Sequence, residues 1–310
     1  MYIKQIGDDH QVDRLYIHWD ITTLCQYKCS YCYARDEYID NWMEEANWKK
    51  QQYVLKVLGK STLPIFLGLL GGEPTLHPKY NDFLEIIRSE ILVKSDDSRL
   101  YITTNLARDI DFFDGHSVGS KKEYFLISWH PEYVNTLELN NMFIEKVRVL
   151  KQKGYKIKIN VLLHPDNVYW DNTYDIINKL SDIGDIIIHP HFIYSSPHNK
   201  IEYTKEFYEY FDSILEGRAR KEFIFIDSNN KHDYFSDVEV FNLGINQFKG
   251  WKCWNNNYEI NLDCNINQFC IERSHNINVN YFRDIKKINP IICQHEYCSC
   301  DGLLKVKKEL

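Results

Sequence analysis

The sequence predicts an α/β protein built around a parallel sheet, and three observations support this fold class. Stretches rich in branched and aromatic residues alternate with amphipathic helical patterns over residues 14–220, which gives six strand–helix units. One predicted strand, Ile65–Leu70, is apolar throughout, as expected for a parallel strand covered on both faces. Polar residues follow each strand, as expected where a parallel sheet opens onto a site.

The predicted elements follow one another at short intervals. The first strand leads into a loop with three cysteines, and a helix that Gly59 terminates comes next. Short runs of branched or aromatic residues define the other strands, and apolar residues three and four positions apart define the helices. The predicted strands are 14–21, 65–70, 100–103, 124–127, 156–163 and 185–188, and the predicted helices are 42–58, 80–92, 138–153, 171–182 and 203–220.

The rest of the chain divides around these units. Residues 1–12 are predicted to form a short lead-in. Residues 225–250 are polar and show little regular pattern, so we interpret 223–250 as a connecting segment. It separates a core domain, 1–222, from a small cysteine-rich domain, 251–310.

Composition and charge exclude several classes of function. The chain has 310 residues and a formal net charge of −7, which is not typical of a nucleic-acid-binding surface. The first residues lack the apolar segment of a secretion signal, and the longest apolar run, Leu63–Leu70, is far too short to span a bilayer. We therefore expect a cytoplasmic protein whose partners include neither nucleic acid nor a membrane.

The cysteines are unevenly distributed. Three of the nine lie in residues 25–32, six lie in residues 253–300, and none lies between. In a cytoplasmic protein such groups indicate metal or iron–sulfur sites rather than disulfides.

The first group, Cys25, Cys29 and Cys32, lies on the loop that leaves the first predicted strand. Three thiolates within eight residues reach three corners of one iron–sulfur cube and leave the fourth iron without a protein ligand. A zinc site is the alternative. Zinc needs four ligands, however, and a C-x2-C pair usually meets a second pair.

A glycine–acid motif, Gly71-Gly72-Glu73-Pro74, follows the second predicted strand. The two glycines allow the backbone to approach a ligand closely. Glu73 offers a carboxylate to an ammonium group. Alone, the motif is better explained as a glycine-rich turn before a helix, and the upstream cysteine loop is what favours a binding role.

Together the two motifs resemble those of the radical S-adenosylmethionine (radical SAM) superfamily. There, three cysteines with this spacing hold a [4Fe-4S] cluster whose fourth iron is chelated by S-adenosylmethionine (SAM). Tyr31 matches the aromatic residue that usually precedes the last cysteine. The family's "GGEP" motif, matched by Gly71–Pro74, receives the SAM amino group. The resemblance implies a partial (β/α)6 barrel that is open on one side.

The resemblance also implies further contacts. By strand order, Ser128 matches the family position that often contacts the SAM ribose, and Asn105 falls in the same pocket. Four histidines also follow predicted strands at the mouth of the barrel. Each is a candidate acid, base or substrate contact, or else a residue that only hydrogen-bonds within its loop. These histidines are His130, His164, His189 and His191.

The carboxy-terminal cysteines resemble the auxiliary-cluster domains of the same superfamily, called SPASM or, in the one-cluster form, twitch. There a β-hairpin lies between two cysteine ligands, which Cys253 and Cys270 match. Cys264 falls at the hairpin turn, where the family usually has glycine, and we interpret it as a turn residue. The other cysteines of this region give five candidates for the four ligand positions of a second [4Fe-4S] cluster. A zinc site built from four of these thiolates is the alternative. The remaining candidate ligands are Cys293, Cys298 and Cys300.

In functional terms, the resemblance implies a radical SAM oxidoreductase. A flavodoxin- or ferredoxin-type protein would donate an electron, reductive cleavage of SAM would give a 5′-deoxyadenosyl radical, and this radical would abstract hydrogen from a substrate C–H bond. An auxiliary cluster favours net oxidation of a small molecule. Two alternatives stay open: a maturase that crosslinks or oxidises a peptide, and a non-catalytic scaffold that binds zinc. The glycine–acid motif argues against the scaffold, which needs no site for a SAM amino group.

Overall fold

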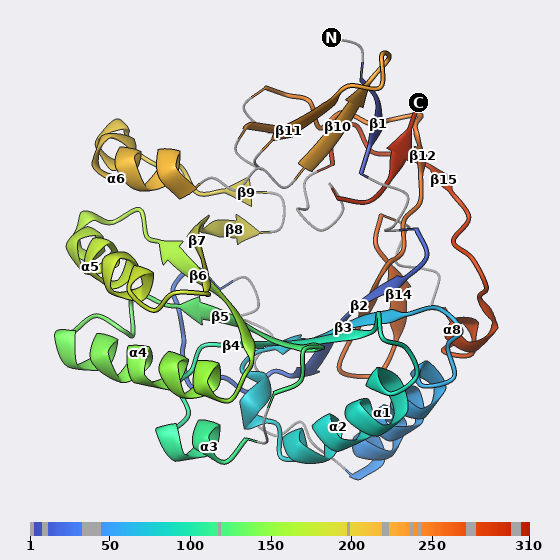
Figure 1. Ribbon diagram of the computed structural model, residues 1–310, viewed down its shortest axis with the longest axis horizontal. Coiled ribbons are helices and arrows are strands. Elements are labelled where there is room, and N and C mark those ends of the chain that lie inside the picture. Colours follow the sequence, from blue (N-terminus) through green and yellow to red (C-terminus); the bar gives the residue numbers. More distant parts are fainter. Residues whose placement is uncertain are drawn as a thin grey trace.

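A parallel sheet lies at the centre of the protein (Figure 1). Six of its parallel strands follow chain order within the described residues, which confirms the predicted α/β class. They are β2 (Leu15–Thr22), β3 (Ile65–Gly71), β4 (Arg99–Thr104), β5 (Glu123–Trp129), β6 (Lys156–Leu163) and β7 (Ile187–Phe192). The computed structural model describes residues 3–7, 12–32, 45–116, 119–196, 199–218, 223–235, 239–240, 243–270, 277–298 and 305–310.

Helices cover the outer face of this sheet (Figure 1). Every second residue of β2, from Leu15 to Ile21, is buried against them, and the ring of Trp19 meets that of Phe83 edge-on at 5.4 Å. The intervening residues of β2 therefore face the concave side. The helices are α1 (Glu45–Leu58), α2 (Tyr80–Ile86) with a π-helical continuation over Ile87–Leu92, α3 (Ile110–Asp114), α4 (Leu137–Gln152), α5 (Trp170–Ser181) and α6 (Lys205–Arg218), with short 3-10 turns at Pro74–Leu76 and Asn167–Tyr169.

A carboxy-terminal hairpin extends the central sheet. Strand β13 (Asn257–Ile260) pairs in parallel with β2, and β14 (Ile266–Gln268) pairs antiparallel with β13. The short helix α8 (Tyr281–Asp284) contacts α1 beside the hairpin. The edge of β2 is therefore covered by residues that lie more than 200 positions later in the sequence.

A second sheet joins the two ends of the chain (Figure 1). The strand order is β11-β10-β1-β16-β12-β15. The first strand of the chain, β1, therefore lies between β10, which belongs to a hairpin within residues 223–235, and β16, the last strand of the chain. The predicted lead-in thus contributes a strand. The members are β1 (Ile3–Ile6), β10 (Phe223–Asp227), β11 (His232–Phe235), β12 (Lys252–Cys253), β15 (Ile291–Ile292) and β16 (Lys308–Glu309), and a separate ribbon pairs β8 (Tyr194–Ser196) with β9 (Asn199–Lys200).

The segment that we interpreted as a connection contains the β10–β11 hairpin. The side chain of Asp227 accepts hydrogen bonds from the backbone N–H groups of Asn229 and Lys231, and Asn230 has a φ of 63°. Asparagine tolerates this left-handed conformation well. The polar stretch at 228–231 is therefore a tight turn between two strands.

Strand β7 also differs from the prediction. It runs from Ile187 to Phe192, so His189, Pro190 and His191 lie within the strand instead of after it. Proline is tolerated there because β7 is the edge strand of the sheet.

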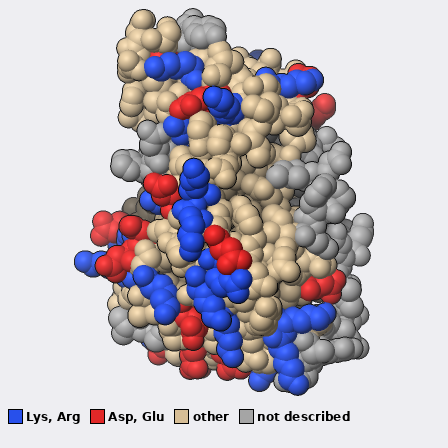
Figure 2. Space-filling view, turned by 90° about the vertical axis from the view of Figure 1, so that its right-hand side faces the viewer, with Lys and Arg blue, Asp and Glu red and all other residues tan. Residues whose placement is uncertain are grey.

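Charged side chains of both signs are interspersed on the face shown in Figure 2. No helix among the described residues is long and apolar enough to cross a membrane.

Candidate active site

The loop with three cysteines leaves the carboxyl end of β2, as predicted. Cys29 is buried, whereas Cys25 and Cys32 are partly exposed. Burial raises the pKa of Cys25 to about 11 and that of Cys29 to about 12. Both thiols are therefore protonated near neutral pH in the metal-free protein, and a metal must displace their protons to bind.

We expect slow alkylation of Cys25 and Cys29 in metal-free protein. Only the thiolate reacts, so a pKa of about 11 instead of the ordinary 9.0 lowers the rate at pH 8 by roughly 100-fold. The raised pKa also means that the rate should climb about tenfold per pH unit between pH 7 and 10. Iodoacetamide labelling read by peptide mass spectrometry measures this. Labelling of either cysteine as fast as an unfolded control peptide at pH 8 would contradict the expectation.

A segment directly after β5 holds the cysteine loop in place. The backbone N–H of Lys28 donates to the hydroxyl of Tyr133 at 2.5 Å, and that of Ser30 donates to the carboxylate of Glu132 at 2.8 Å. The ring of Tyr27 stacks on Tyr133 with centroids 4.2 Å apart. Three positions of the loop, Tyr27, Lys28 and Ser30, are thus fixed by one neighbouring segment.

His130 lies in the same segment, next to a cysteine sulfur. Its Nδ1 is 3.3 Å from Sγ of Cys29 and 3.1 Å from the hydroxyl of Tyr31, on whose ring it stacks. Burial lowers the pKa of His130 to about 4, so the imidazole is neutral near pH 7. His164 lies nearby, with Nε2 3.5 Å from Oε1 of Glu132. Of the predicted histidines, these two therefore border the cysteine loop.

The glycine–acid turn lies directly against the cysteine loop. The N–H of Gly72 donates to the carbonyl of Thr22 at 2.8 Å, and that of Glu73 donates to the carbonyl of Leu24 at 2.6 Å. A Cβ at Gly71, whose φ is +124°, would lie 2.0 Å from the Thr22 carbonyl oxygen, and one at Gly72 would lie 2.3 Å from that of Leu24. In this structure the glycines are thus required for contact between the two loops. The sequence had suggested contact with a ligand instead.

The carboxylate of Glu73 is buried and accepts several hydrogen bonds. Its Oε1 accepts from the backbone N–H of Thr75 at 3.2 Å, from the Thr75 hydroxyl at 2.5 Å and from the Thr104 hydroxyl at 2.8 Å. Its Oε2 accepts from the N–H of Asn105 at 2.7 Å. Burial raises the pKa of Glu73, while the hydrogen bonds from Asn105, Thr75 and Thr104 oppose this shift. Glu73 thus ties the ends of β3 and β4 together.

Asn105 connects this carboxylate to the cysteine loop. Its Nδ2 lies 3.7 Å from Sγ of Cys25, and its backbone N–H binds Glu73. The next residue, Leu106, has a φ of 53°, and its carbonyl accepts from the amine of the buried Lys146 of α4 at 2.8 Å. The structure therefore brings together three parts of the predicted site: Cys25, Glu73 and Asn105.

Ser128 lies on the concave face of β5, away from the buried residues of that strand. It is in register with Asn160 of β6, and Asn160 is in register with His189 of β7. The side-chain oxygen of Asn160 is buried and lacks a hydrogen-bond partner within the described part of the chain. The rings of His189 and His191 lie 5.6 Å apart on β7. Polar groups thus line the concave face beside the loops.

Four of the carboxy-terminal cysteines gather at the second sheet. Burial, together with the neighbouring thiols of Cys298, Cys253 and Cys293, raises the pKa of Cys270 to about 12. Cys253 lies in β12, which pairs with β15 just before Cys293. The side-chain amide of Asn246 donates a hydrogen bond to the backbone carbonyl of Cys298 at 3.1 Å.

Cys264 stands apart from these four thiols. It occupies the turn of the β13–β14 hairpin with a φ of 63°, and Lys50 and Asp263 are the charged groups that act on its thiol. These features suit the turn role that we inferred from the sequence. Cys300 lies outside the described residues. Nowhere in the described ranges do three Cys, His, Asp or Glu side chains form a group compact enough for a single metal ion.

Several residues of the site were not identified from the sequence, namely Glu132, Tyr133, Thr104 and Asn160. The sequence does contain a weak indication of each of these residues. Thr104 and the 132–133 pair stand at or just after strand ends, and Asn160 is a polar position in an otherwise alternating strand.

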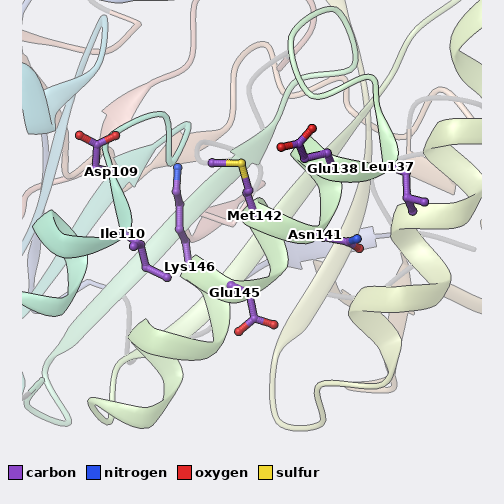
Figure 3. Close-up of a pocket in the computed structure, with 8 residues that line it drawn as sticks. All are labelled: Asp109, Ile110, Leu137, Glu138, Asn141, Met142, Glu145 and Lys146. Atoms are coloured by element: carbon purple, nitrogen blue, oxygen red, sulfur yellow. The ribbon is translucent and has the colours of Figure 1, made fainter.

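A groove of about 710 Å³ lies between α3 and α4 and does not coincide with this site (Figure 3). Apolar side chains of Ile110, Leu137 and Met142 line it, together with Glu145. Lys146 is its link to the site, because the amine of Lys146 holds the carbonyl beside Asn105.

The sequence matches no family model and no curated protein. Solved structures of radical SAM enzymes do resemble the protein in fold. The structure of anSMEcpe with bound AdoMet has a TM-score of 0.54 at 15% identity, and the match covers 88% of this chain and 79% of that one. Streptococcus suis SuiB bound to its precursor peptide SuiA has a TM-score of 0.51 at 13% identity, with 89% and 66% covered. The chain thus spans just under two thirds of SuiB.

A further structure, anSMEcpe with AdoMet and the Cp18Cys peptide, has a TM-score of 0.52 at 14% identity, with 88% of this chain and 78% of that one covered. At these identities the likeness concerns the fold. The α/β architecture with a parallel sheet is that of radical SAM enzymes.

Proposed function

We propose that this protein is a radical SAM enzyme. The observation that carries the proposal is the direct contact between the three-cysteine loop and the Gly71–Pro74 turn at the carboxyl ends of β2 and β3. Two motifs far apart in sequence thus form one structural unit. The fold that the chain shares with AdoMet-bound enzymes supports the same conclusion.

The side chains present fit the cofactors that this function requires. Three thiols from one loop suit a [4Fe-4S] cluster with one open iron, and Cys25, Cys29 and Cys32 would hold it. The glycine–acid turn, Asn105 and Ser128 would bind SAM. When bound, the cluster and SAM supply the radical chemistry that removes hydrogen from a C–H bond. The chain itself holds both loops rigid through Glu73, Asn105 and the segment after β5.

We propose a second [4Fe-4S] cluster at the four gathered thiols, with Cys300 as a fifth candidate ligand. Gathering of four thiols suits such a group. Because a second electron-transfer centre would then lie in the same protein, net oxidation of a small molecule is the reaction that we favour. A flavodoxin- or ferredoxin-type protein would supply the electron, and we place the enzyme in the cytoplasm because its cysteines are grouped for metal rather than for disulfides.

A peptide substrate is the second candidate. Two structures with this fold hold peptides, the precursor peptide SuiA in SuiB and the Cp18Cys peptide in anSMEcpe. The concave face that bears Ser128 and Asn160 would receive either kind of substrate, because it adjoins the site where SAM would bind.

The proposal is tested by the iron and sulfide content of anaerobically reconstituted protein, with a variant that lacks Cys25, Cys29 and Cys32 as the comparison. We expect about eight irons in the wild type and about four in the Cys→Ala triple variant. The wild type, supplied with dithionite and SAM, should form 5′-deoxyadenosine, and the triple variant should not. Zinc and no iron in both proteins would overturn the enzyme and support the scaffold.

A further inference from the structure

The chain makes a sharp turn at Leu106, directly after β4. The φ of Leu106 is 53°, a left-handed conformation that costs leucine free energy because its Cβ crowds the backbone. The turn lies between the end of β4 and the start of α3, so its peptide groups have no partners from a regular strand or helix. Its N–H groups are paired locally: those of Asn105, Leu106 and Ala107 donate to the side chains of Glu73, Thr104 and Asn105 at 2.7, 3.1 and 2.9 Å. The carbonyl of Leu106 is left to be paired by a residue from elsewhere.

The same turn sets the orientation of the buried Asn105 side chain. Its Oδ1 accepts from the N–H of Ala107, on the far side of Leu106. Its Nδ2 therefore faces the cysteine loop, where it lies 3.7 Å from Sγ of Cys25. A change in the backbone at Leu106 would move the N–H of Ala107, and with it the group that holds the Asn105 amide.

The partner of the Leu106 carbonyl is a lysine on α4. Nζ of Lys146 donates to it at 2.8 Å, and Figure 3 shows this side chain extending from α4 toward the segment that precedes α3. Only 8% of Lys146 is exposed, and burial lowers the pKa of its amine, while Asp109 opposes the shift. Burying an amine costs free energy, so an apolar side chain would be more stable here if the position only filled space. The amine therefore has a specific role at this carbonyl.

We propose that Lys146 is a positioning residue for SAM binding. It keeps the backbone at Leu106 left-handed, and this turn keeps the Asn105 amide beside Cys25. The inference rests on the proposed function, because it takes Asn105 as a contact of SAM. Without the amine, Leu106 can relax to the extended or right-handed backbone that leucine prefers, and the Asn105 side chain loses its fixed orientation. A residue on the outer helical layer thus controls a group on the binding loop.

The test compares three variants of the full chain, reconstituted without oxygen. Lys146→Met removes the amine and keeps an unbranched side chain. Lys146→Arg keeps a donor, and the groove that Lys146 borders leaves room for the larger side chain. Lys151→Met is the matched control, since Lys151 lies on the same helix and donates to the carbonyl of Ile183 at 3.2 Å, in a turn before β7 and away from the loops. Hydrogen exchange of residues 104–107 is followed by mass spectrometry, and SAM affinity by equilibrium dialysis without a reductant, so that SAM stays intact.

In Lys146→Met we expect exchange of the 104–107 amides to be roughly 10-fold faster and SAM binding to be roughly 10- to 100-fold weaker, as for the loss of a hydrogen bond from a charged donor. Its iron content should equal that of the wild type, and Lys146→Arg and Lys151→Met should match the wild type in all three measurements.

Unchanged exchange in Lys146→Met would overturn the role of Lys146, whatever the wild type binds. Faster exchange with unchanged SAM affinity would overturn it as well, and so would an equal loss of affinity in Lys151→Met. A wild type that binds no SAM would instead refute the proposed function itself.

Discussion

Replacing Cys29 with alanine is expected to abolish 5′-deoxyadenosine formation. Cys29 is the most buried of the three thiols in its loop, with 4% of its surface exposed, and its sulfur lies 3.3 Å from His130. Without it two thiols remain, which are too few to hold a cube with one open iron. We expect the rate to fall by roughly a thousandfold or more, as for the loss of a member of a catalytic unit. The iron content should fall by about four per chain.

Cys264→Gly provides the matched control for this experiment. It also removes one thiol, but from the β13–β14 turn, where the φ of 63° suits glycine. We expect full iron content and an unchanged rate. Product formation that survives in Cys29→Ala would remove the three-cysteine loop from the mechanism. An equal loss in both variants would point to general disruption of the protein.

Glu73→Gln is expected to damage the site although it changes only one atom. The two carboxylate oxygens accept from two backbone N–H groups, those of Thr75 and Asn105, and neither group can reverse its hydrogen bond. Glutamine offers one oxygen and one NH2 group, so one backbone donor must face another donor in either orientation. The free energy of unfolding should fall by about 1–3 kcal/mol. The rate of SAM cleavage should fall roughly 10- to 100-fold because Asn105 is no longer fixed.

Glu123→Gln separates the effect on the site from the effect on stability. Glu123 is also buried, and it binds Arg88 at 2.7 Å and the backbone N–H of Ser120 at 3.2 Å, at the amino end of β5 and away from the loops. This variant should lose stability in chemical denaturation while it keeps its rate of SAM cleavage. Glu73→Gln with a normal rate would show that the turn does not depend on the carboxylate.

The strands of the central sheet could be read from the sequence because their signals are local. The predicted strand 156–163 coincides with β6, whose side chains alternate between buried and partly exposed. The second sheet was not predicted for the opposite reason. Strand β1 is four residues long, and its partners β10 and β16 lie more than 200 positions away in the sequence. The residues around position 3 therefore carry no local pattern from which this pairing could be predicted.

The candidate site was predicted at the level of motifs but not of contacts. The cysteine loop and the turn at Gly71–Pro74 were identified, because their residue types and spacing are unusual. The partners of Glu73 were not, because Thr104 reaches it only through the register of β3 and β4. The glycines illustrate the same limit, since the carbonyl groups that exclude a side chain there belong to another loop.

The pairing of β13 with β2 has a consequence for how this protein can change during evolution. The carboxy-terminal segment supplies the strand that covers the edge of β2, and it also supplies β16, the partner of β1. Deleting it would expose two rows of backbone donors and acceptors, which are prone to aggregate. A segment exchanged from another protein would have to match both edges in length and register, besides bringing its cysteines. The two cysteine regions are therefore expected to be inherited together rather than shuffled as independent modules.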